Sequence, residues 1–110
     1  MTKKILLLLK AGYKFENMLK EYLNQNGFSV EVARSASEVL YKLKRSPHIL
    51  LLVEQDNYEM DCLELFLNVL DIQSNIHVIF LGSMGQQNKE QIVRLGGIYL
   101  DSPIQVEVLR

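Results

Sequence analysis

Several features that mark particular classes of protein are scarce or missing in this 110-residue sequence. Cys62 is the only cysteine, so the chain cannot form an internal disulfide, and it lacks the cysteine spacing of a metal site. This favours a reducing compartment, and we expect a cytoplasmic protein. The net charge of -1 lacks the positive excess typical of proteins that bind nucleic acid or an anionic membrane. The apolar run at residues 5–9 is shorter than the core of a signal peptide, so we expect a buried strand there.

The sequence does contain enough apolar residues for one compact domain. Hydrophobic residues make up 48% of the chain and charged residues 23%, which is an ordinary balance for a globular protein. Neither an internal repeat nor a linker rich in proline and glycine divides the sequence. We therefore predict a single domain over residues 1–110.

Strand-like and helix-like patterns alternate along the chain. Short apolar runs indicate buried strands, and apolar residues at every third or fourth position indicate amphipathic helices. The predicted strands are residues 5–9, 28–32, 49–53, 77–81 and 98–100, and the predicted helices are residues 15–23, 35–43, 63–70 and 88–95. Ser35 and Glu38 form a capping box, and Asn26-Gly27 marks a helix end. This alternation predicts an α/β fold with a parallel five-stranded sheet between two helical layers. The side chains expected to be buried in it are Leu6, Leu8, Leu51, Val53, Ile79 and Leu81.

Four segments in order, "KILLLLK", "SPHILLLVEQDNYEMDCLEL", "HVIFLGS" and "GGIYLDSPI", resemble the receiver domain of bacterial response regulators (the CheY-like family). The resemblance implies a flavodoxin-like, doubly wound sheet of order 2-1-3-4-5. It also implies a two-component phosphorelay, in which a partner kinase's histidine passes a phosphoryl group to an aspartate after the third strand. A full fifth helix would extend past Arg110, so we expect a fragment of a longer chain with that helix truncated. Truncation would leave apolar surface near the last two strands for a partner subunit or a tail.

The sequence departs from the family's pattern at every position that carries the chemistry. Counting back seven residues from Asp61, which matches the family's turn after the acceptor, places Glu54 at the acceptor position. The pair of acids that hold Mg²⁺ in the family falls on Leu9 and Lys10. The hydroxyl that contacts the phosphoryl group falls on Gly82, although the neighbouring Ser83 could substitute for it. The lysine before the conserved turn proline falls on Ser102.

These departures predict a pseudo-receiver, which signals by binding protein and is not an enzyme. We expect it to need no metal or cofactor. We also expect Lys10 to lie close to Glu54 or Asp56 and to neutralise part of the acidic loop, the acid-rich segment that follows the third predicted strand. The partner would be another protein, a downstream output domain or a second copy of the chain, and neither nucleic acid nor a membrane. Glu54 could mimic a phosphorylated state or have a structural role. Three alternatives stay open: a phosphorylatable receiver that uses Glu54 or Asp56, a flavodoxin-like ligand-binding module, and a structural dimerisation module.

Other residues that could carry a function have an equally simple structural explanation. Tyr99 stands where the family has an aromatic that moves between exposed and buried states, but it could also be an ordinary ring on an edge strand. The acids around Cys62 disfavour its thiolate. His48 and His77 precede strands, so we expect them at the end of the sheet away from the site, with too few other ligands to bind a metal. Three cations at the end of the second helix, Lys42, Lys44 and Arg45, match a solvated helix terminus.

Overall fold

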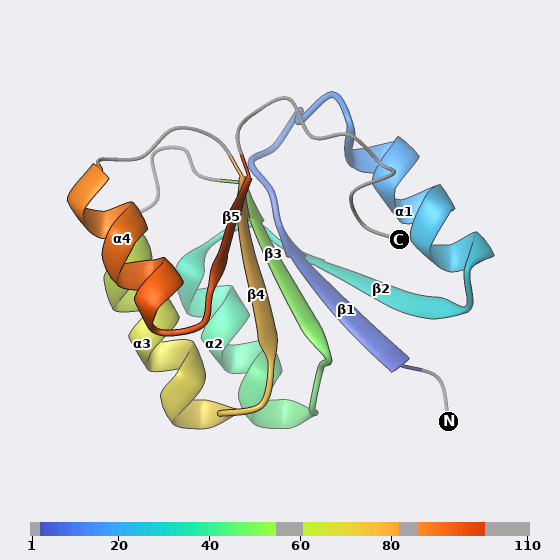
Figure 1. Cartoon of the computed structure of the whole chain (residues 1–110). Helices are drawn as coiled ribbons and strands as arrows, with labels where there is room; N and C mark the ends of the chain where they lie inside the picture. The colour runs from blue at the N-terminus through green and yellow to red at the C-terminus, as the bar shows by residue number, and fades with distance from the viewer. Residues whose placement is uncertain (1–2, 55–60, 82–85, 101–110) are drawn as a thin grey trace.

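The computed structural model describes residues 3–54, 61–81 and 86–100. Strands and helices alternate along the chain, and all strand pairings are parallel (Figure 1). The elements are β1 (Lys3–Leu8), α1 (Glu16–Gln25), β2 (Phe28–Ala33), α2 (Ala36–Arg45), β3 (Leu50–Glu54), α3 (Cys62–Ile72), β4 (His77–Leu81), α4 (Gln86–Arg94) and β5 (Ile98–Leu100). The sheet order is β2-β1-β3-β4-β5, which confirms the predicted flavodoxin-like topology. The prediction that the fifth helix is truncated concerns residues 101–110, which lie outside the described residues.

The two faces of the sheet are covered by different helices (Figure 1). Side chains alternate between the two faces along each strand, so consecutive residues within β1, and likewise within β3, belong to different cores. One core packs with α2, α3 and α4, and its strand residues include Leu6, Leu8, Leu51 and Val53. The other core packs with α1, and its strand residues include Ile5, Leu7, Leu52 and Leu81. The central strands are thus covered on both faces, which explains their unbroken apolar sequences.

The predicted core is confirmed with one exception. Five of the six side chains expected to be buried are at most 1% exposed, but Ile79 is only half-buried. Ile79 lies on the α1 side of β4, whereas α1 packs against β2 at the opposite edge of the sheet. The prediction was wrong for Ile79 because burial on this face depends on the position of α1. Ile49, expected in the third strand, lies just before β3 and is exposed.

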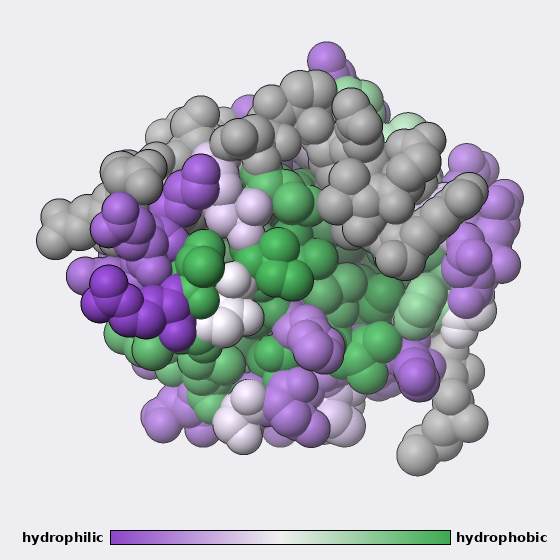
Figure 2. All heavy atoms as spheres, viewed as in Figure 1, coloured by the Kyte–Doolittle hydropathy of each residue, from purple (hydrophilic) through white to green (hydrophobic). Residues whose placement is uncertain are grey.

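The surface over the last two strands is partly apolar. Ile98 of β5 is 46% exposed, and Leu100 and Ile79 are half-buried. Figure 2 shows hydrophobic surface at the centre of this view, with hydrophilic surface to either side. Exposed apolar area was expected near these strands.

Local signals fix where α2 begins. The backbone N–H of Glu38 donates to the Ser35 hydroxyl at 3.1 Å, as a capping box requires. The Glu38 carboxylate accepts from the backbone N–H of Arg34 at 2.7 Å, one residue before the helix cap. The capping box is therefore present in a variant form. Its second bond ties the end of β2 to the first turn of the helix.

Candidate functional site

The candidate site lies at the carboxyl ends of β1 and β3, where ligands bind in open parallel sheets. β1 is followed by Leu9 and Lys10, and β3 ends at Glu54. The register pairs Leu8 of β1 with Val53 of β3. Leu9, directly after β1, and Glu54, the last residue of β3, are therefore neighbours across two adjacent strands. This brings together three of the positions singled out in the sequence.

Glu54 is a buried carboxylate paired with an ammonium group. It is 8% exposed, and Lys10 Nζ lies 3.8 Å from its Oε1 atom. The predicted proximity of Lys10 to the acidic loop is thus confirmed for Glu54, while Asp56 lies outside the described residues. The pKa of the Tyr13 hydroxyl is raised, mainly by burial and to a smaller extent by the negative charge of Glu54. Among the described residues, the Glu54 carboxylate therefore lies beside the ammonium of Lys10.

Leu9 is part of the hydrophobic core. Its side chain is fully buried in the cluster that packs with α1, and its backbone N–H donates to the Ala33 carbonyl at 3.2 Å. A side chain in this position contributes to packing and offers no ligand atom for a cation.

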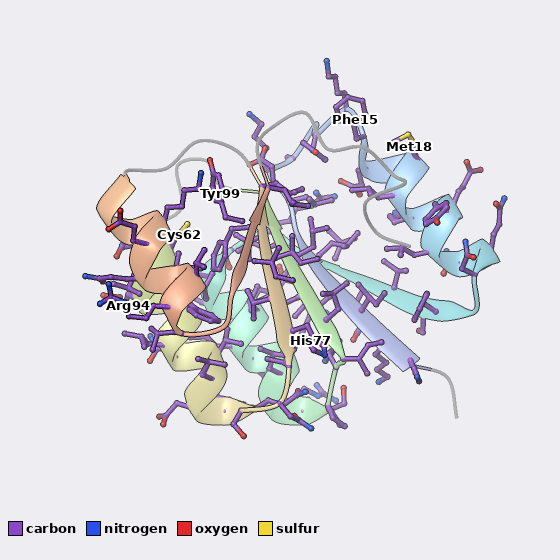
Figure 3. All side chains as sticks on the ribbon, viewed as in Figure 1. Phe15, Met18, Cys62, His77, Arg94 and Tyr99 are labelled. Carbon is purple, nitrogen blue, oxygen red and sulfur yellow. The ribbon has the colours of Figure 1, made fainter. Side chains whose placement is uncertain are left out.

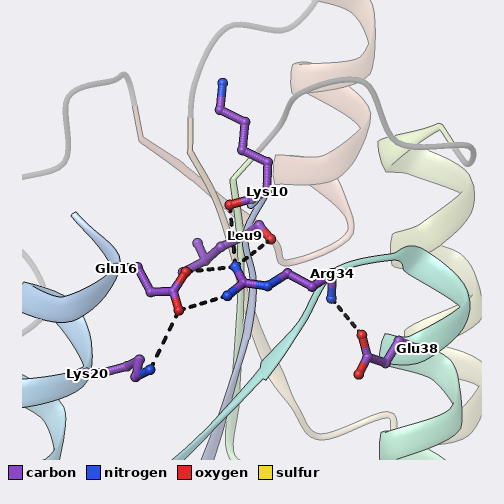
Figure 4. Close-up of polar contacts among 6 residues, drawn as sticks. All are labelled: Leu9, Lys10, Glu16, Lys20, Arg34 and Glu38. Atoms are coloured by element: carbon purple, nitrogen blue, oxygen red, sulfur yellow. Dashed lines mark hydrogen bonds and ion pairs between the residues drawn. The ribbon is translucent and has the colours of Figure 1, made fainter. Parts of the chain in front are cut away.

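Arg34 ties the loop after β1 to the neighbouring elements (Figure 4). Its guanidinium donates to both carboxylate oxygens of Glu16, at 2.7 and 2.9 Å. The same group lies 3.3 and 3.4 Å from the carbonyl oxygens of Leu9 and Lys10. Lys20 adds a weaker contact to Glu16 at 3.6 Å. The hydrogen bonds and charge of Arg34 lower the pKa of Glu16.

Arg34 was not identified from the sequence. The sequence features that could have indicated this pair are an arginine, Arg34, directly after an edge strand, and an acid, Glu16, in the first turn of the preceding helix. That signal alone could not show that the two side chains meet, because 18 positions separate them. The structure shows that a guanidinium fixes the backbone of the loop that carries Lys10.

The Arg34→Gln substitution should destabilise the protein by about 1 kcal/mol at neutral pH, because the pair is partly exposed. The pKa of Glu16 in the folded state is below its ordinary value of 4.5. The ionised Glu16 carboxylate therefore stabilises the fold above about pH 4.5, and this stabilisation is lost as pH falls through the folded-state pKa. The stability difference between wild type and variant should therefore shrink below about pH 4.5. Urea unfolding at pH 7 and pH 3.5 measures this difference, with Lys20→Gln as the control of smaller effect. An equal difference at both pH values would contradict the assignment.

Two positions implied by the resemblance, Gly82 and Ser102, lie outside the described residues, as does Ser83. Tyr99 is half-buried, and its ring packs against the core beneath α2, α3 and α4 (Figure 3). Lys89 Nζ lies 4.5 Å from the centre of the Tyr99 ring, which is a cation–π geometry. The ring thus contacts α4 in this structure, and its movement between exposed and buried states stays a prediction.

Cys62 begins α3 and is buried. Burial raises the pKa of its thiol to about 11, and the charge of Asp61 adds to this effect. The thiol is therefore protonated at neutral pH, which confirms the expectation that its thiolate is disfavoured. Burial proves to be the larger cause, where the sequence suggested only the nearby acids.

The two histidines lie at the amino-terminal end of the sheet, as predicted (Figure 3 labels His77). His77 is exposed, but His48 is buried with Nε2 2.6 Å from Glu31 Oε1 and Nδ1 3.0 Å from the Ser46 carbonyl. Within the described ranges, no group of three or more histidine, cysteine or acidic residues is placed to hold a metal ion. No helix in those ranges is long and apolar enough to cross a membrane.

The comparisons with known proteins bear on the fold. No protein-family model matches the chain, and no curated protein matches its sequence. A CheY-like response regulator receiver domain protein from Methanospirillum hungatei JF-1 has a similar structure, with a TM-score of 0.87 and 22% identity over 99% of this chain and 88% of that chain.

Two further structures are similar over nearly the whole chain. One is a response regulator from Burkholderia pseudomallei with a phosphorylated aspartic acid, a calcium ion and citrate, with a TM-score of 0.82 and 23% identity over 97% of this chain and 64% of that chain. The other is an adenylate cyclase from Rhodopirellula baltica, with a TM-score of 0.80 and 25% identity over 99% of this chain and 82% of that chain. The chain has the CheY-like receiver fold, a flavodoxin-like architecture.

Proposed function

We propose that this chain is a pseudo-receiver, a receiver-like signalling domain that accepts no phosphoryl group and acts by binding protein. The observation that carries the proposal is the ion pair between Lys10 Nζ and the buried Glu54 carboxylate, 3.8 Å apart. This pair stands where the resemblance implies a phosphoacceptor aspartate and a magnesium-binding acid.

The chemistry of phosphoryl transfer to a carboxylate explains why this pair matters. The reaction requires a nucleophile aligned with the phosphorus atom and cations that balance the charge on the phosphoryl oxygens. At the positions of the two metal-binding acids, Leu9 is buried in the core, and the ammonium of Lys10 would repel a divalent cation. The extra methylene of Glu54 displaces its oxygens by roughly 1 Å relative to an aspartate, a shift that disturbs in-line attack. The same carboxylate serves instead to hold the loop after β1.

The remaining features of the proposal follow from an interaction role. The domain is not an enzyme and requires no cofactor, and the adenylate cyclase activity named for one similar structure belongs to that protein. The partner of the present domain is a protein, either an output domain or a second copy of the chain. Neither nucleic acid nor a membrane is its partner, and it acts in a cytoplasmic signalling system. The exposed apolar residues Val93, Leu95 and Ile98, around α4 and β5, support docking on that side.

Phosphorylation tests the proposal directly. The wild-type chain and the Glu54→Asp variant would each be incubated with Mg²⁺ and phosphoramidate, a small phosphoryl donor, and examined by intact mass spectrometry. We expect no adduct on either protein, because restoring the aspartate leaves Leu9 and Lys10 in place of the metal-binding acids. A receiver domain that carries the complete set of acids, treated in parallel, shows that the donor is active.

A mass increase of one phosphoryl group on the wild-type chain would overturn the pseudo-receiver proposal. The protein would then be an ordinary phosphorelay receiver, and peptide mapping would show whether Glu54 or Asp56 is the acceptor. An adduct on Glu54→Asp alone would show that Lys10 does not exclude the chemistry, which also contradicts the argument above.

A further inference from the structure

A hollow of about 430 Å³ lies at the amino-terminal end of the sheet, opposite the candidate site. The residues that line it come from the beginning of β1, from β2, and from the end of α2 and the residue after it. Small-molecule sites typically have volumes of roughly 300–1,000 Å³. The residues that line it are Lys4, Glu31, Tyr41, Lys42, Arg45 and Ser46.

Three of the six lining residues are cations, and neighbouring hydroxyl groups orient two of them. Lys4 Nζ donates to the Ser46 hydroxyl at 3.2 Å. The Arg45 guanidinium donates to the Tyr41 hydroxyl at 2.8 Å, and its central carbon lies 5.5 Å from the centre of the Tyr41 ring. Cations held in place in this way lose less conformational freedom when they bind an anion.

The carboxylate in the hollow is already engaged. Glu31 Oε1 lies 2.6 Å from Nε2 of the buried His48 ring, and its Oε2 lies 3.9 Å from Lys42 Nζ. The hydrogen bond to His48 is the main reason that the pKa of Glu31 is lowered, and the charges of Lys42 and Lys4 lower it further. The lining of the hollow therefore holds three cations and one carboxylate.

Attraction of cations to the carboxyl end of α2 does not account for this arrangement. That attraction acts on all three basic residues of the last helical turn, Lys42, Lys44 and Arg45, wherever they point around the helix. Only Lys42 and Arg45 line the hollow, where they meet Lys4 from a different element. The cations converge on one space.

We propose that this hollow binds the phosphate group of a small soluble molecule. Three convergent cations suit a doubly charged oxyanion, and a guanidinium can donate two parallel hydrogen bonds to it. The Tyr41 and Ser46 hydroxyls add donors at the rim. The inference is independent of the proposed function, because the hollow is at the other end of the sheet from Lys10 and Glu54.

Titration with inorganic pyrophosphate tests this site in the intact chain. Backbone amide resonances would be followed by NMR without added metal, at an ionic strength held constant with sodium chloride. We expect the largest shifts at residues 4, 31, 41–42 and 45–46. Arg45→Ala should weaken binding by about tenfold or more, the loss expected for a charge-assisted hydrogen bond.

Lys44→Ala is the matched control, since it removes the same charge from the same helical turn without changing the lining. We expect its affinity to stay within about twofold of the wild type, because an exposed charge outside the site is screened by salt. Each spectrum also reports whether the variant is folded. Equal losses in the two variants would reveal diffuse electrostatic attraction and would overturn the proposal. So would shifts confined to other parts of the chain, or no binding.

Discussion

Replacing Phe66 with alanine should lower the free energy of unfolding by about 3–5 kcal/mol, which is a large share of the stability of a domain of this size. Phe66 is 1% exposed and lies on α3, between that helix and the sheet. Its ring meets Phe80 of β4 edge to face, with the ring centres 5.8 Å apart. Truncation would remove this aromatic contact and leave a cavity that the surrounding elements fill only in part.

The control for Phe66 is its neighbour Leu67, which is 49% exposed on the same helix. Leu67→Ala should change stability by less than about 0.5 kcal/mol, as is usual for exposed positions. Urea unfolding monitored by circular dichroism measures both variants. Similar losses for the two substitutions would contradict the assignment of Phe66 to the core.

Replacing His48 with alanine should destabilise the protein by about 2–4 kcal/mol at neutral pH. The His48 ring is buried and bridges the Glu31 carboxylate of β2 to the Ser46 carbonyl after α2. The variant would lose both contacts and leave a cavity. The side chain of Gln73 would still hold the backbone of residue 48, so the effect belongs to the ring.

The pH dependence of the His48→Ala effect identifies its cause. The pKa of Glu31 is lowered from its ordinary value of 4.5, chiefly by the hydrogen bond to His48. Stability from this bond is therefore present above that value and is lost as pH falls through the folded-state pKa. The difference in stability between wild type and His48→Ala should therefore narrow as pH falls below about 4.5.

His77 offers a matched control for His48. It lies at the same end of the sheet but is exposed, so His77→Ala should cost less than about 0.5 kcal/mol. Thermal unfolding of the three proteins between pH 3.5 and pH 7 supplies the comparison. A large effect of His77→Ala, or a small effect of His48→Ala, would refute the role assigned to the buried ring.

The candidate site could be predicted from the sequence to the extent that it depends on strand order. Parallel strands bring their carboxyl ends to one edge, and the order 2-1-3-4-5 that the resemblance implied makes β1 and β3 adjacent, so residues at the ends of these two strands were expected to be neighbours. This explains why Lys10 was predicted to lie close to Glu54 or Asp56, and its Nζ atom is observed 3.8 Å from Glu54 Oε1. Gly82 and Ser102 stay predictions, as does the loss of phosphoryl transfer.

Sequence alone determined the type and order of the secondary structure, because each element is encoded by a local pattern. The period of apolar residues distinguishes strands from helices, and Ser35 caps α2 through a bond to a residue three positions away. Only the tertiary structure decided the pairing of Arg34 with Glu16 and of His48 with Glu31, and the incomplete burial of Ile79. The partners in these pairs are 18 and 17 positions apart, so their contact depends on how separate elements pack and which rotamers they allow. Ile79 has the same local sequence pattern as its buried neighbours. It is only partly covered because α1 packs over β2, and one helix cannot cover a whole face of a five-stranded sheet.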